Sequence, residues 1–167
     1  EVDNVTFCIQ GPMVGEHKGE IVPYAKNLSS SIKKLFPRSK LVVSSWENQA
    51  EYAFDGPDDF VFTSDPGSGI RYGDGTKNNI NRQILSSRAS LELVETEYAV
   101  KIRSDLIFLN NRLRSILKSF EKPRESLFNL GLFSHHIMVI DRLTFSTELA
   151  PPNLAMPLHV GDHFQLG

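Results

Sequence analysis

Three charged side chains occupy alternate positions in one otherwise apolar segment, residues 98–108. With the two-residue period of a β-strand, Lys101, Arg103 and Asp105 share one face. A central parallel strand is buried on both faces, so charges on it must pair or bind a ligand. An ion pair between Arg103 and Asp105 is the structural explanation. We favour a binding role, because these charges gather toward the carboxyl end of the strand, where open α/β sheets bind ligands.

A second candidate site is the run Asn-Asn-Ile-Asn-Arg-Gln at residues 78–83, which opens a predicted helix. Asparagine is a good N-cap, and a helix N-terminus attracts phosphate. Arg82 lies about 200° around the helix from Ile80, so its planar fork can pair with a pyrophosphate there. A solvated arginine is the structural alternative. Asparagines are poor helix formers, however, and we therefore predict that Asn79, Asn81 and Arg82 bind a ligand.

Two other strand ends carry binding candidates, and an ordinary turn explains each of them equally well. Gln10, Gly11 and Pro12 close the first predicted strand, before a loop long enough to wrap part of a ligand. Asp65 precedes a Pro-Gly pair after the third strand. Its carboxylate can accept a hydrogen bond from a base or a ribose hydroxyl, although Asp-Pro-Gly is also common turn chemistry.

Near the C-terminus, Asp162 lies between His159 and His163. This cluster can bind a metal or provide a base, and the spacing alone does not decide between them. The two histidines would share a face only in a helix, which Gly161 disfavours. No zinc pattern accompanies them.

The elements that position these residues alternate between strand and helix. Strands are predicted at residues 5–9, 41–46, 60–63, 98–108, 126–133 and 137–140, with His135 and His136 in a loop. Residues 13–19 are predicted as a loop, and the first helix follows from the spacing of Ile21, Tyr24, Leu28, Ile32 and Leu35. The second helix covers residues 78–94, with Ile80, Ile84 and Leu91 on its apolar side, and a short third one contains Leu113, Ile116, Leu117 and Phe120. The alternation predicts an α/β fold, a mostly parallel central sheet flanked by helices, with a less regular segment after Asp141.

Composition narrows the class of protein. The 167 residues suit one domain, with 40% hydrophobic residues and a formal net charge of -2. Such a balanced charge gives no basic face for nucleic acid. Cys8 is the single cysteine, which fits a reducing compartment such as the cytoplasm, and no apolar run approaches the length of a membrane span.

Six segments together resemble the WavE lipopolysaccharide-synthesis family. They are Phe7 to Pro12, Ser44 to Glu47, Asp65 to Gly67, Asn78 to Gln83, Lys101 to Leu106 and His159 to Phe164. The Asn-Asn-x-Asn-Arg-Gln and Lys-x-Arg-Ser-Asp-Leu segments are the specific ones, and the matches cover nearly the whole chain.

The resemblance implies a Rossmann-like GT-A glycosyltransferase that acts in bacterial surface-polysaccharide assembly on a nucleotide-sugar donor. Residues 1–122 would be the nucleotide-sugar-binding half, and residues 123–167 the acceptor-side half. GT-A enzymes hold a divalent metal with an Asp-x-Asp motif after the fourth strand. Arg103-Ser104-Asp105 stands at that place, so Asp105 would hold Mg²⁺ or Mn²⁺, or Arg103 would partly replace the metal's charge. The residues expected to bind the donor are Gln10, Gly11, Pro12, Asp65, Asn79, Asn81, Arg82 and Lys101.

Asp162 is the candidate base for the acceptor hydroxyl, alongside Asp105 and Arg103 as catalytic residues. The acceptor would be a carbohydrate or a lipid-linked saccharide, and a lipid-linked acceptor would imply that this cytoplasmic protein works at the inner membrane face. Two alternatives stay open. A sugar-phosphate nucleotidylyltransferase would carry an arginine in the loop at residues 10–19, which has only Lys18. A non-catalytic nucleotide-sugar-binding module would explain the incomplete Asp-x-Asp motif.

Overall fold

The strands of the largest sheet follow the order β5-β4-β1-β8-β10-β9. The computed structural model describes residues 4–70, 75, 77–108, 113–114, 138–139 and 164–166. The sheet consists of β1 (Val5–Gln10), β4 (Lys40–Trp46), β5 (Asp59–Thr63), β8 (Tyr98–Arg103), β9 (Met138–Val139) and β10 (Phe164–Leu166). The first four in spatial order run parallel, and β10 is antiparallel to both β8 and β9. A mostly parallel α/β sheet is thus confirmed.

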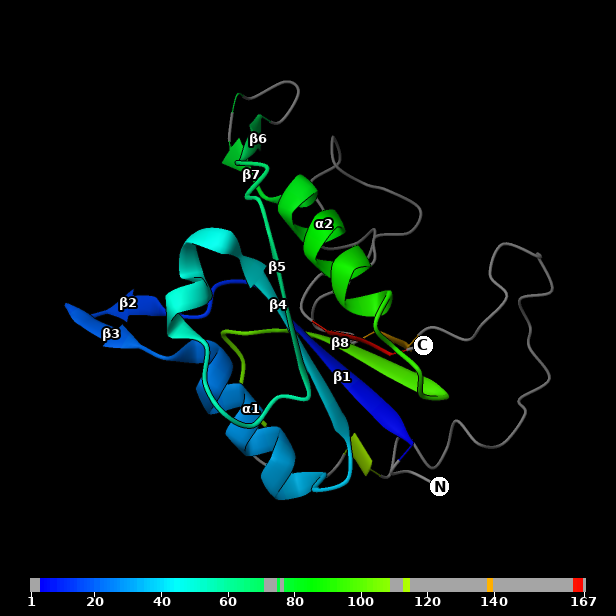
Figure 1. The fold of residues 1–167 in the computed structure, drawn as a ribbon. Helices are drawn as coiled ribbons and strands as arrows, with labels where there is room; N and C mark the ends of the chain where they lie inside the picture. The colour runs from blue at the N-terminus through cyan, green and yellow to red at the C-terminus, as the bar shows by residue number, and fades with distance from the viewer. Residues whose placement is uncertain are drawn as a thin grey trace, which may run out of the picture.

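The central strand β1 is buried along its whole length. On one face Val5, Phe7 and Ile9 join the hydrophobic core. On the other, Cys8 and Gln10 meet helix α2 (Ile80–Leu91) through hydrogen bonds. Successive residues of a strand point to opposite faces, so helix α1 (Tyr24–Leu35) and α2 cover opposite sides of the sheet (Figure 1).

Helix α1 packs its apolar stripe into the core, as its spacing predicts. Ala25, Leu28 and Ile32 are fully buried, and the Phe36 ring after the helix lies 5.1 Å from the Phe7 ring, centroid to centroid. The helix starts at Tyr24, directly after Pro23, which pre-sets its own φ and disfavours a helical conformation in the residue before it.

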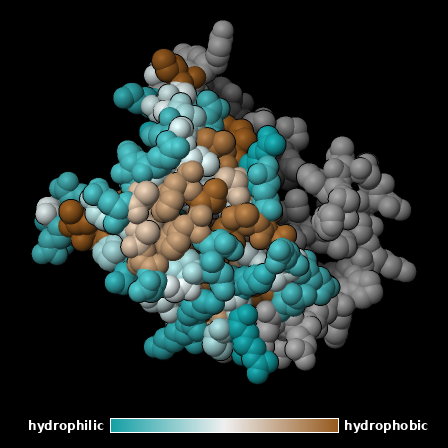
Figure 2. Space-filling model, in the orientation of Figure 1, coloured by the Kyte–Doolittle hydropathy of each residue, from teal (hydrophilic) through white to brown (hydrophobic). Residues whose placement is uncertain are grey.

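The prediction that Ile21 belongs to this helix is wrong. Ile21 lies in β3 (Glu20–Val22), and its side chain is 68% exposed. This strand pairs with β2 (Gly15–His17) in a hairpin that begins inside the predicted loop 13–19. Figure 2 shows a hydrophobic spot on this hairpin, at the left of the view. The turn residues Lys18 and Gly19 both have positive φ, which matches the twist of a two-residue hairpin.

Helix α2 is shorter than predicted, and its apolar side does not face the core. Ile80, Ile84 and Leu91 are exposed by 56%, 62% and 45%, while Ser86 and Ser90 are buried against the sheet. The Ser86 and Ser90 hydroxyls donate to the carbonyls of Arg82 and Ser86, at 2.8 and 3.0 Å. Each buried serine thus finds its acceptor one turn earlier in the helix, so α2 can lie close on a polar strand face.

The remaining described elements are short. The 3₁₀-helix η1 (Glu47–Tyr52) follows β4, and β6 (Gly69–Ile70) pairs with β7 (Lys77–Asn78) before α2. Strand β8 ends at Arg103 rather than at residue 108, because the chain turns at Ser104 and Asp105.

Most of the remaining predictions lie outside the described residues. Of the predicted third helix, Leu113 and Arg114 are helical, and Ile116, Leu117 and Phe120 are not described. The predicted strand 126–133 and the loop residues His135 and His136 also lie outside the described residues. Strand β9 falls within the predicted strand 137–140. No described helix has the length and apolar character to cross a membrane.

Gly11 gives a prediction about this fold. Its φ is +116°, and a Cβ there would lie 2.9 Å from the Ser104 hydroxyl oxygen. Gly11→Ala should therefore lower the free energy of unfolding by about 1–3 kcal/mol in urea denaturation. Gly19→Ala is the control, since φ is +83° there and nothing lies within 4 Å of its Cβ position. Equal losses in the two variants would show that the close approach to Ser104 has no energetic weight.

Candidate functional site

A polar cleft of about 470 Å³ opens at the carboxyl ends of the parallel strands. The chain runs from β1 to β4 and β5 on one side of the sheet, and returns through α2 to β8 on the other side of β1. Such a reversal is the switch point at which open α/β sheets bind ligands. The cleft is lined by Gln10, Gly11, Pro12, Trp46, Asn48, Gln49, Asp65, Asn79, Arg82, Gln83, Ser86, Arg103, Ser104 and Asp105.

One wall of the cleft carries an ion pair between Arg103 and Asp105. Nε and Nη2 of Arg103 donate to the two carboxylate oxygens at 3.0 and 2.6 Å, in a fork-to-fork geometry. The turn after β8 brings Asp105 back toward the arginine at the strand end. The Arg103–Asp105 ion pair, which was the structural explanation of the charges on this strand, therefore forms, and it lies at the cleft.

A second pair, Arg82 with Asp65, also lines the cleft. Nε and Nη2 of Arg82 donate to the Asp65 carboxylate at 2.7 and 2.5 Å, and Nη1 donates to Asn79 Oδ1 at 3.1 Å. Asp65 also accepts the Gly67 amide at 2.9 Å, so the expected turn is present as well. The hydrogen bond from Arg82 holds the pKa of Asp65 below its usual range. The cleft thus presents two oriented guanidinium groups, each facing a carboxylate.

The floor of the cleft is buried and polar. Gln10 is 3% exposed, and its Oε1 accepts a hydrogen bond from the Ser87 hydroxyl at 2.5 Å, with the Ser86 hydroxyl at 3.3 Å. Ser104 is 1% exposed, and its hydroxyl has no hydrogen-bond partner among the described residues. On the β4 side, Gln49 Oε1 accepts the Met13 amide at 2.5 Å and ties η1 to the segment after β1.

The structure gathers most of the predicted donor-binding residues, but not all of them. Asn81 is exposed and is not among the cleft residues, because Arg82 and Ser86, four residues apart, define the face of α2 that points there. Lys101 shares the strand face of Arg103 but lies two residues earlier, on the wall of a separate hollow. Asp162, with His159 and His163, lies outside the described residues.

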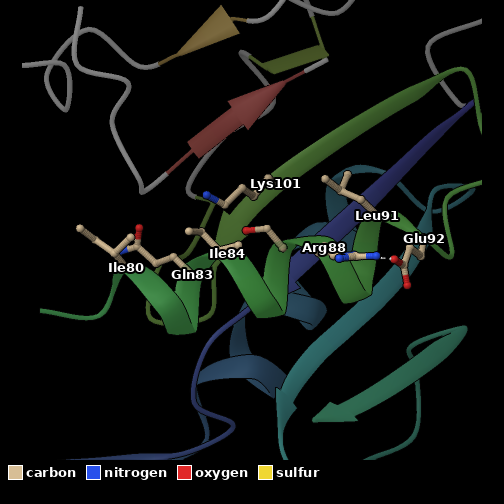
Figure 3. A pocket seen from close by; sticks show the side chains of 8 residues that line it. Ile80, Gln83, Ile84, Arg88, Leu91, Glu92 and Lys101 are labelled. Carbon is tan, nitrogen blue, oxygen red and sulfur yellow. Dashed lines mark hydrogen bonds and ion pairs between the residues drawn. The ribbon is translucent and has the colours of Figure 1, made fainter. Parts of the chain in front are cut away.

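That second hollow, of about 580 Å³, lies along α2 and is mostly apolar. Figure 3 shows Lys101 of β8 above helix α2, with Ile80 and Ile84 in its N-terminal half and Leu91 at its C-terminal end. The Arg88–Glu92 pair at its far end, 2.8 Å apart, is well exposed, and such pairs contribute little to stability. The two hollows are therefore chemically different, and the polar one is the candidate site.

Several cleft residues were not predicted as site residues: Trp46, Asn48, Gln49, Gln83, Ser86 and Ser104. Trp46 ends β4 at the same sheet edge as Gln10 and Arg103, so the strand-end rule that found those two also applies to it. Ser86 follows Arg82 by one helical turn, a spacing readable from the sequence.

The described residues do not by themselves fit a divalent cation. They contain no group of three or more His, Cys, Asp or Glu side chains that could hold a metal. The two acidic side chains that line the cleft, Asp65 and Asp105, are each engaged by an arginine. The role of Asp105 as a ligand of Mg²⁺ or Mn²⁺ stays a prediction.

Comparison with known proteins gives one match. The model of the family described as WavE lipopolysaccharide synthesis matches residues 5–167. The chain belongs to the WavE lipopolysaccharide synthesis family. No curated protein and no solved structure shows a significant match. Membership in the WavE family implies a role in lipopolysaccharide synthesis, and the family match spans both the described cleft and the segment around Asp162.

The Asp65–Arg82 pair gives a prediction about pH. Because the folded-state pKa of Asp65 is lowered, the pair stabilises the fold above the unfolded pKa of about 3.9, and this contribution is lost as the pH falls below that value. Asp65→Asn should therefore lower the melting temperature at pH 7, with a loss below about 1 kcal/mol for so exposed a pair, and the deficit should shrink as the pH falls from about 3.9 toward 3. The exposed Asp55, replaced by Asn, is the control. A deficit of the Asp65 variant that is unchanged at pH 3 would contradict the assignment.

Proposed function

We propose that this protein is a glycosyltransferase that moves a sugar from a nucleotide-sugar donor to a growing bacterial surface polysaccharide, a lipopolysaccharide core or a capsule. The observation that carries the proposal is the cleft at the sheet's switch point, with two arginines, in a chain of a lipopolysaccharide-synthesis family. The α/β sheet is compatible with a GT-A fold, which stays part of the proposal.

The donor diphosphate would bind between the two arginines. Arg82 stands near the N-terminus of α2, where the helix dipole favours an anion, and Arg103 ends β8 and lines the same cleft. A phosphate has to compete with Asp65 and Asp105 for the arginine forks. The pairs are roughly one-third exposed, so each carboxylate contributes little net free energy and a more highly charged diphosphate can displace it.

In the transfer step, the acceptor hydroxyl oxygen forms a bond to the anomeric carbon. The bond from that carbon to the phosphate oxygen breaks, and its electron pair stays on the nucleoside diphosphate. Arg103, with Arg82, would stabilise the negative charge that develops there. Once the diphosphate occupies the arginine forks, these cations act on the leaving group without further reorganisation at the moment of reaction.

The hydroxyl proton would pass to Asp162, the proposed general base. Strand β10 begins at Phe164, two residues after Asp162, and Phe164 pairs with Ile102, the residue before Arg103. Two residues span at most about 7 Å of extended chain. The strand pairing therefore supports a base on the Arg103 side of the cleft.

Asp105 would serve as the ligand if Mg²⁺ or Mn²⁺ takes part, and a bound cation would add further charge compensation at the diphosphate. A second candidate function is a nucleotide-sugar-binding module without turnover. One observation favours it: an arginine stands where the first carboxylate of an Asp-x-Asp motif would be, and it holds the remaining Asp105.

The first experiment measures the melting temperature with UDP, GDP, CMP and dTDP, each with and without Mn²⁺. A bound nucleotide should raise the melting temperature by a few degrees at saturating concentration, by mass action. Arg82→Ala should lose this shift, and Arg88→Ala, on the same helix but outside the polar cleft, should keep it. Asp105→Ala tells whether a metal on Asp105 or the Arg103 cation compensates the charge of the diphosphate. If Mn²⁺ increases the melting-temperature shift in wild type but not in Asp105→Ala, the metal is supported. A shift that does not depend on Mn²⁺ supports Arg103. Absence of any shift with wild type would contradict the proposal.

A second experiment tests Asp162 with a radiolabelled nucleotide sugar and a lipopolysaccharide acceptor. Asp162→Asn should lower the transfer rate by about 100-fold or more, since general-base catalysis contributes about that much, while the nucleotide shift is unchanged. Full activity in this variant would remove Asp162 from the role. Nucleotide binding without transfer in wild type, under every donor that binds, would favour the non-catalytic module.

A further inference from the structure

The amide of Gln10 is held in one orientation by a residue outside the cleft. Ser87 lies on α2 and lines the apolar hollow rather than the polar cleft. Its hydroxyl donates to Gln10 Oε1 at 2.5 Å. The neighbouring serine hydroxyls, Ser86 and Ser90, donate to helix carbonyls, which leaves Ser87 as the main donor toward Gln10.

Because the serine hydroxyls engage Oε1, Nε2 is the amide atom that can still form a hydrogen bond. Gln10 lines the cleft although it is 97% buried. Its Nε2 has no acceptor among the described residues, and it is not sealed from solvent as the Ser104 hydroxyl is. An amide N–H without an acceptor in the protein needs a ligand or water to accept from it. Nε2 is therefore a donor available to whatever binds.

The position of Gln10 indicates the kind of atom that accepts. Gln10 pairs with Arg103 across the β1–β8 ladder, and the Ser86 hydroxyl beside it lies one helical turn from Arg82. Gln10 therefore shares the cleft with both arginines, with Arg103 on the neighbouring strand and Arg82 one helical turn from its Ser86 contact. An oxygen that is attracted to both cations is anionic, which makes a phosphoryl oxygen the acceptor that suits Nε2 best.

We infer that Ser87 is a positioning residue for phosphate binding: it fixes the Gln10 amide so that Nε2 donates to a phosphoryl oxygen of the ligand. The inference rests on the proposed function, since it assumes a nucleoside diphosphate in the cleft. Ser87 itself touches no ligand and acts only through Gln10. In this role Ser87 contributes to ligand affinity from outside the cleft, which a residue that only packs the helix against the sheet would not do.

The test is a double-mutant cycle on nucleotide affinity. The probe is whichever of UDP, GDP and dTDP binds wild type most tightly, measured by titration calorimetry. Ser87→Ala should weaken binding by about threefold to tenfold, the range of one net hydrogen bond. The higher helix propensity of alanine offsets part of the lost Ser87–Gln10 hydrogen bond, so the melting temperature should fall only slightly. Ser87→Thr, which retains the hydroxyl, should keep the affinity.

The decisive comparison is made in the Gln10→Ala background. If Ser87 acts through Gln10, then Ser87→Ala has no further effect on affinity there, because the two changes remove the same contact. Ser90→Ala is the matched control: its hydroxyl bonds only to the Ser86 and Ser87 carbonyls in the described structure, so affinity should not change.

Each failure has its own meaning. Wild-type affinity in Ser87→Ala, or a loss that adds fully to that of Gln10→Ala, overturns the positioning role and leaves the proposed function intact. If none of the diphosphates binds wild type, the proposed function fails and the inference fails with it.

Discussion

The burial of β1 on both faces is the constraint on which the rest of this structure depends. Parallel neighbours on each side satisfy the backbone hydrogen bonds of β1, and its side chains point alternately toward the two helices. Toward α1 these side chains are apolar and need only be covered. Toward α2 they include Thr6 and Gln10, which are buried and polar and must be hydrogen-bonded. Thr6 bonds to Thr96. Gln10 accepts from the Ser87 and Ser86 hydroxyls of α2, so serines on this helix serve the sheet where leucines could not.

The serine interface in turn determines where the chemistry lies. Small side chains let α2 lie close on β1 and β4, and this brings Arg82 to the cleft at the carboxyl end of the sheet, which Arg103 also lines. Each arginine is oriented by a carboxylate, so the cleft is ordered and nearly neutral before any ligand arrives. An anionic ligand then meets donors already in position, which lowers the conformational entropy lost on binding.

Much of this arrangement could be predicted from the sequence. Parallel strands end at a common edge, so Gln10, Asp65 and Arg103 were expected to converge, and they do. Asp105 was also expected at this edge, although it lies in the turn after β8 rather than on the strand. The apolar stripe of α2 was placed wrongly, because periodicity identifies a helix's apolar face and assumes that this face is buried. Where the facing strand is polar, the assumption fails.

The residues that were missed or misplaced share one physical cause. Whether Lys101 reaches the cleft depends on how far along β8 the cleft extends, and whether Gln49 does depends on how η1 folds back over the segment after β1. Both depend on distances between elements that local sequence does not encode. The hydrogen bond from Ser87 to Gln10 belongs to the same class, since its partners are 77 positions apart in the chain. A sequence can show which side chains are able to bind, but the separation of helix and sheet decides which of them meet.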